Sequence, residues 1–97
     1  MRGWHLFKRS VAGPARLTCY TKAGCCLCDQ ARKALDRLAA RGLATVEYVP
    51  IEGDPALTAA YGARIPVVTL GDAVLAEGKV SEVWLARALA ARRVPAP

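Results

Sequence analysis

The sequence predicts an α/β domain whose elements follow the order βαβαββα, with a four-stranded mixed sheet flanked by helices. Short runs rich in β-branched residues alternate with apolar patterns of helical period, and a two-residue Gly-Asp connection separates the last two strand-like runs. The hydrophobic content of 54% suits a packed core, and 97 residues are enough for one such domain.

The first three predicted elements form a βαβ unit. A strand is predicted over Leu17–Thr21, and a helix begins near Leu27, with apolar residues at intervals of three and four until Gly42 ends the pattern. A second strand over Thr45–Val49 closes at Pro50. A right-handed crossover makes the two strands parallel.

The last four predicted elements are a short helix, a hairpin and a final helix. An Asp-Pro pair, with aspartate as N-cap and proline in the first turn, starts a helix that runs to Tyr61. Val67–Leu70 and Ala73–Ala76 flank the Gly-Asp connection and predict an antiparallel hairpin. A helix over Ser81–Arg92 follows. Its predicted apolar face carries Val83, Trp84, Ala88 and Leu89.

The charge distribution separates a basic N-terminal segment from the domain. The net charge is +6, and residues 1–16 contain four basic residues and no acid. We predict a basic N-terminal tail over residues 1–15, one domain over 16–93 and a C-terminal tail over 94–97. No aromatic and basic interleaving or docking motif accompanies the charge, so no nucleic-acid partner is predicted. No run approaches the roughly 20 apolar residues of a membrane span, and no signal peptide is recognisable, so a cytoplasmic location is predicted.

Three of the four cysteines lie where the first strand gives way to the first helix, and Cys25 and Cys28 form a C-x-x-C pair. A helix N-terminus favours negative charge, so a sulfur there ionises more easily than a free thiol. About 2 kcal/mol of stabilisation lowers a thiol pKa from about 8.5 to about 7. We expect Lys22 to contribute to this lowering and Asp29 to oppose it. In a reducing compartment, such cysteines are more often reactive or metal-binding than part of a static disulfide framework.

The C-x-x-C before the first helix and the Ile65-Pro66 step before the third strand resemble motifs of the thioredoxin superfamily, specifically the glutaredoxins. The resemblance covers about residues 16–92. More narrowly, Tyr20–Asp29 and Tyr61–Val67 look like a branch of short bacterial glutaredoxin-like proteins with a C-x-L-C active-site motif.

The resemblance implies a small thiol–disulfide oxidoreductase in which Cys25 attacks a disulfide and Cys28 resolves the mixed disulfide. Its implied partners are protein or low-molecular-weight thiols and disulfides, with glutathione as a candidate reductant or co-substrate. No bound cofactor or metal is expected, and the protein is expected to be a monomer. The implied substrate-binding residues are Lys22, Ile65, Pro66 and Gly78, with a cis peptide bond at Pro66 and the Ile65 backbone offered to the substrate.

Two positions depart from the glutaredoxin pattern. Leu27 stands where an aromatic residue commonly precedes the second cysteine, and Glu77 replaces the first glycine of a Gly-Gly pair. The Glu77 charge is expected to face an anionic tripeptide unfavourably. Cys26 is interpreted as an incidental, partly exposed thiol, and Cys19 as a small core residue.

Two alternatives stay open. One is a glutaredoxin-like protein that binds an iron–sulfur cluster or another metal, because Cys25, Cys26 and Cys28 are close in sequence. The other is a non-catalytic module that keeps the fold and holds a partner in the cleft around Pro66.

Overall fold

A computed structural model of the chain describes residues 14–93. The described residues form β1 (Ala15–Thr21), α2 (Cys26–Ala40), β2 (Ala44–Pro50), α3 (Pro55–Tyr61), β3 (Val67–Leu70), β4 (Ala73–Glu77) and α4 (Glu82–Arg93). The predicted order βαβαββα is therefore confirmed. The predicted C-terminal tail and residues 1–13 of the predicted N-terminal tail lie outside the described residues, and β1 begins at Ala15.

The sheet has the strand order β2-β1-β3-β4 and is mixed, as the sequence predicts. β1 and β2 are parallel, which the crossover through α2 requires. β3 runs antiparallel to both β1 and β4. The turn between β3 and β4 contains Gly71 at a φ of 59°, a left-handed conformation that glycine adopts without steric cost.

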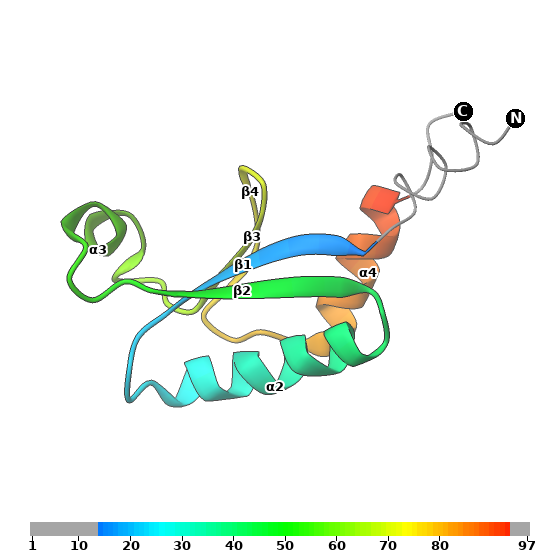
Figure 1. Cartoon of the computed structure of the whole chain (residues 1–97), viewed down its shortest axis with the longest axis horizontal. Coiled ribbons are helices and arrows are strands. Elements are labelled where there is room, and N and C mark those ends of the chain that lie inside the picture. The colour runs from blue at the N-terminus through cyan, green and yellow to red at the C-terminus, as the bar shows by residue number, and fades with distance from the viewer. Residues whose placement is uncertain (1–13, 94–97) are drawn as a thin grey trace, which may run out of the picture.

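The core lies between one face of the sheet and the helices α2 and α4, which Figure 1 shows on the same side of the strands. Alternate residues of β1 point into this core, and α2 contributes residues three and four positions apart. Burial of each leucine there contributes about 1.5–3 kcal/mol of transfer free energy. The least exposed core residues include Leu17, Cys19, Ala31, Leu35, Leu38, Val68, Leu85 and Leu89.

The face that α4 turns toward the core differs from the prediction. Leu85 and Leu89 are buried, whereas Val83 is 63% and Trp84 59% exposed, so the predicted burial of those two residues is wrong. Each helical residue advances about 100° around the axis, and a helix that buries Leu85 therefore points Val83 away from the sheet. Trp84 lies at the margin, where its indole N–H donates a hydrogen bond of 3.2 Å to the carbonyl oxygen of Leu75.

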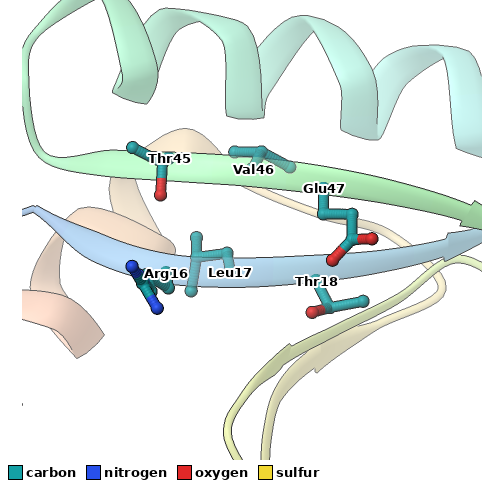
Figure 2. Close-up of a pocket in the computed structure, with 6 residues that line it drawn as sticks. All are labelled: Arg16, Leu17, Thr18, Thr45, Val46 and Glu47. Atoms are coloured by element: carbon teal, nitrogen blue, oxygen red, sulfur yellow. The ribbon is translucent and has the colours of Figure 1, made fainter.

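α3 lies beyond the ends of β1 and β2 in Figure 1, away from the layer of α2 and α4. A shallow pocket of about 280 Å³ lies between β1 and β2, and Figure 2 shows its lining residues, Arg16, Leu17, Thr18, Thr45, Val46 and Glu47. These belong to the first half of β1 and the neighbouring part of β2, while the cysteine pair follows the other end of β1. Among the helices of residues 14–93, none is both long and apolar enough to cross a membrane.

Candidate active site

Cys25 occupies the N-cap position of α2. Its backbone is extended, with φ −98° and ψ 115°, and its sulfur accepts a hydrogen bond of 3.3 Å from the backbone N–H of Cys28. N-cap positions usually carry Ser, Thr, Asp or Asn, whose oxygens satisfy the free N–H groups of the first turn. A sulfur takes that place here. The acceptor role is best fulfilled by a thiolate, because a negative charge complements the positive end of the helix dipole.

The environment separates the acidities of the two cysteines. The pKa of Cys25 is lowered, mainly by a hydrogen bond from the Cys28 side chain and then by backbone N–H groups of Cys28 and Leu27. Asp29 opposes this lowering, as predicted, while the Lys22 ammonium is not among its causes, contrary to the prediction. Burial and the hydrogen bond to Cys25 raise the pKa of Cys28 to about 11. Cys25 therefore ionises first, while Cys28 keeps its proton and can donate it toward the neighbouring sulfur.

The two cysteines also differ in their exposure to solvent. Cys25 is partly exposed, whereas only 5% of Cys28 is exposed. The lowered pKa and the access to solvent together describe a reactive thiol, because the thiolate is the nucleophilic form. Cys28 lies one helical turn away, close enough to exchange bonds with Cys25.

The lowered pKa predicts that iodoacetamide alkylates Cys25 faster as pH rises and that the rate levels off below the ordinary thiol pKa of 9.0. Alkylation rates between about pH 5 and about pH 10, measured by mass spectrometry in the Cys26→Ser variant, test this expectation. Cys28→Ala removes the largest cause of the lowering and should move the midpoint upward. A midpoint at or above 9.0 in the Cys26→Ser variant would contradict the assignment.

The other two cysteines differ from this pair. Cys19 is fully buried in β1, and burial raises the pKa of its thiol to about 12, which fits the predicted core role. Cys26 is exposed at the first residue of α2. Cys26 and Cys28 are two positions apart on the helix, so their side chains do not share a face. Within residues 14–93, no group of three His, Cys, Asp or Glu side chains is placed to hold a metal ion.

Lys22 joins β1 to the cysteine loop. Its backbone N–H hydrogen-bonds the sulfur of Cys28 and partly offsets the raised pKa of that thiol. The next residue, Ala23, donates its N–H to Glu52 Oε2 at 3.0 Å, which fastens the loop to the segment after β2. Lys22 also lines a pocket of about 610 Å³ together with Ile51, Glu52, Gly53, Thr58, Ala59, Gly62 and Ala63.

The strand register brings the remaining predicted residues to the same edge of the sheet. Tyr20 of β1 pairs with Val67 of β3, and the same register continued by one residue places Pro66 beside Thr21. Glu77 of β4 also pairs with Val67, so Gly78 lies at this edge too. The Gly78 N–H donates to the Pro66 carbonyl oxygen at 2.8 Å.

Pro66 is fully buried and its peptide bond with Ile65 is cis, whereas Ile65 is partly exposed. The two predicted groups of site residues therefore lie on adjacent chain segments. The cysteines and Lys22 follow β1, and Ile65 and Pro66 precede β3.

Two contacts near this edge have no counterpart in the prediction. The rings of Tyr20 and Tyr61 stack with centroids 4.3 Å apart, which fixes α3 against β1. Arg64 forms an ion pair of 3.0 Å with Glu77. The residues were visible in the sequence, but each contact joins segments far apart along the chain, and no local pattern identifies such partners.

Comparisons with known proteins identify the family and the fold. Residues 16–90 match the family described as Glutaredoxin-like domain (DUF836). The chain is 34% identical to target protein XcR50 from X. campestris, whose X-ray structure superimposes with a TM-score of 0.67 over 84% of this chain and 99% of that one. The solution structure of Ne2328 from Nitrosomonas europaea gives 26% identity and a TM-score of 0.66, covering 77% of this chain and 91% of that one.

A more distant likeness is to the germline-specific thioredoxin Deadhead from Drosophila. It is 20% identical, with a TM-score of 0.55 over 94% of this chain and 92% of that one, and it supports the fold alone. Among curated proteins, none matches the chain significantly. The family match spans most of the chain, and the protein belongs to the glutaredoxin-like family of the thioredoxin superfamily.

Proposed function

We propose that the protein is a thiol–disulfide oxidoreductase that uses Cys25 and Cys28 to reduce or exchange disulfides. The observation that carries this proposal is the Cys25 sulfur at the N-cap of α2, partly exposed and with a lowered pKa, one turn from a buried thiol that stays protonated. The glutaredoxin-like family and its thioredoxin fold are compatible with such a redox role.

The proposed reaction proceeds through two thiolate attacks. The Cys25 thiolate attacks one sulfur of a substrate disulfide, whose S–S bond breaks, and the departing thiolate takes a proton from water. Cys28 then gives up its proton and attacks the Cys25 sulfur, which releases the second substrate thiol. The substrate gains two electrons, and the protein is left with a Cys25–Cys28 disulfide. An external thiol, either glutathione or a protein dithiol, returns the two electrons.

The raised pKa of Cys28 fits its place as the second attacking group. The buried thiol remains neutral while Cys25 is the anion, so the two sulfurs do not compete for the first attack. Proton loss from Cys28 is needed only after Cys25 has become part of a mixed disulfide. At that stage the Cys25 sulfur no longer carries the charge that opposes a second thiolate.

The substrate is proposed to bind along the edge of the sheet next to the cysteines. Lys22 is an exposed cation there, the partly exposed Ile65 offers its backbone, and Pro66 and Gly78 shape the segment beside it. The proposed partners are protein or low-molecular-weight thiols and disulfides, and no bound cofactor is needed. The reaction suits a monomer in the reducing cytoplasm.

Redox equilibration against glutathione, followed by mass mapping of disulfides, tests the proposal. The expected dominant product under mild oxidant is a bridge between Cys25 and Cys28, in wild type and in Cys26→Ser alike. A dominant bridge from Cys26, or no intramolecular bridge at any glutathione ratio, would contradict the proposed function. A brown protein that contains acid-labile sulfur would favour the iron–sulfur alternative instead.

A further inference from the structure

The segment Arg64–Pro66 is fastened to the end of β4 by three contacts. Arg64 Nη1 lies 3.0 Å from Glu77 Oε2. The N–H of the next residue, Gly78, donates to the carbonyl oxygens of Pro66 at 2.8 Å and Arg64 at 3.2 Å. The ion pair and the two backbone hydrogen bonds enclose Ile65, the residue whose backbone the proposed function assigns to the substrate.

Arg64 is also held from the side of α3. Its Nη2 donates to the carbonyl oxygen of Ala60 at 2.9 Å, and its guanidinium carbon lies 5.5 Å from the ring centroid of Tyr61. Tyr61 in turn stacks on Tyr20 of β1. One side chain therefore connects α3, the segment before β3 and the end of β4. A planar guanidinium suits this task, because its donors point in fixed directions.

The two terminal nitrogens of Arg64 each face a partner in the chain, while its side chain stays 43% exposed. Both terminal nitrogens already donate to groups of the chain, to Glu77 and to Ala60. The same pairing partly offsets the negative charge of Glu77, which would otherwise repel an anionic substrate more strongly at this edge. The internal hydrogen bonds of Arg64 and the offset charge of Glu77 both indicate that the pair affects substrate binding. Neither residue appears among the causes that shift the pKa of Cys25.

We propose that Arg64 and Glu77 are positioning residues that hold the Ile65 backbone in place for the polypeptide chain beside a substrate disulfide. The inference rests on the proposed function. It adds that the effect of the pair is confined to substrates with peptide groups beside the disulfide, because only such groups can hydrogen-bond the Ile65 backbone. The pair acts as a unit, because removal of either charge leaves the other without its partner.

Steady-state kinetics with a short peptide disulfide, and dithiothreitol as the electron donor, test the pair. Arg64→Met and Glu77→Met should each raise KM by about twofold to fivefold with kcat unchanged. The double variant should be no worse than Arg64→Met alone. The rate at which iodoacetamide alkylates Cys25 should stay at the wild-type value in all three. Arg41→Met is the matched control, because it breaks a similar ion pair of 3.1 Å, with Glu82, between α2 and α4.

Three results would overturn the positioning role: KM unchanged in folded variants, additive effects in the double variant, or an alkylation rate that falls in parallel with activity. Variants that lose thermal stability but keep the wild-type KM would also overturn the positioning role. A wild-type protein that reduces no disulfide would instead refute the proposed function, and this inference with it. The two failures are distinguishable because the first appears only in the variants.

Discussion

Replacement of Cys25 by serine is expected to reduce disulfide exchange to the rate measured without protein. A serine hydroxyl forms no disulfide, and Cys19 and Cys28 are buried thiols whose pKa values are raised. Serine can still cap α2, since its oxygen accepts a hydrogen bond from the first turn. The variant should therefore remain folded. Turnover of a peptide disulfide with dithiothreitol, together with the circular dichroism spectrum, provides the measurement.

Cys28→Ser separates the two attacks. This variant should still perform the first one and accumulate a mixed disulfide between Cys25 and the substrate, visible as a mass increase of one substrate thiol less two hydrogen atoms. Cys26→Ser is the control and should keep the wild-type rate, because Cys26 does not share a helix face with Cys28. A Cys25→Ser protein that retains substantial turnover, or a Cys26→Ser protein that loses it, would disprove the assignment of the nucleophile.

The largest expected effect on stability is that of Leu35→Ala. Leu35 is fully buried in α2, in the core that joins the helix to the sheet. Truncation of a buried leucine costs about 2–5 kcal/mol, from lost transfer free energy and from the cavity left behind. Since the free energy of unfolding of small domains is about 5–15 kcal/mol, this variant should lose a large fraction of it.

Urea unfolding measures the effect as a lower transition midpoint with little change in slope. Leu27→Ala in the same helix is the matched control, because 39% of Leu27 is exposed and less burial is lost than at Leu35. Equal losses for the two variants would show that the core is not centred on Leu35. A changed slope would point to a denatured state of different compactness.

Local patterns account for most of the fold that could be predicted. The helical period from Leu27 to Gly42 and the Gly71-Asp72 turn depend on neighbouring residues, and the structure has the helix and the hairpin there. The spacing of apolar residues in α4 does not define one buried face, because its sequence is apolar on more than one side. Burial of Leu85 and exposure of Val83 depend on how the helix meets the sheet. No pattern within the helix contains that information.

In the candidate site, too, local features could be predicted and long-range contacts could not. The placement of Cys25 before a helix was predictable, since a helix start and a C-x-x-C pair are both local features. The source of its lowered pKa was predicted only in part, because the nearest charged neighbour in sequence, Lys22, is not among the causes. The contacts of Arg64 with Glu77 and of Ala23 with Glu52 join residues 13 and 29 positions apart. They require the folded topology.

Because the Cys25 sulfur caps α2, the stability of the first helical turn depends on the redox state of the cysteine pair. On oxidation the Cys25 sulfur becomes neutral and a poor acceptor, so the N–H of Cys28 loses its charged partner. A helix cap contributes about 1 kcal/mol, and for a two-electron couple 1.4 kcal/mol corresponds to about 30 mV. The cap therefore makes the dithiol form easier to reach by roughly 20 mV. In the proposed reaction, this capping hydrogen bond would weaken on each oxidation and strengthen again on each reduction.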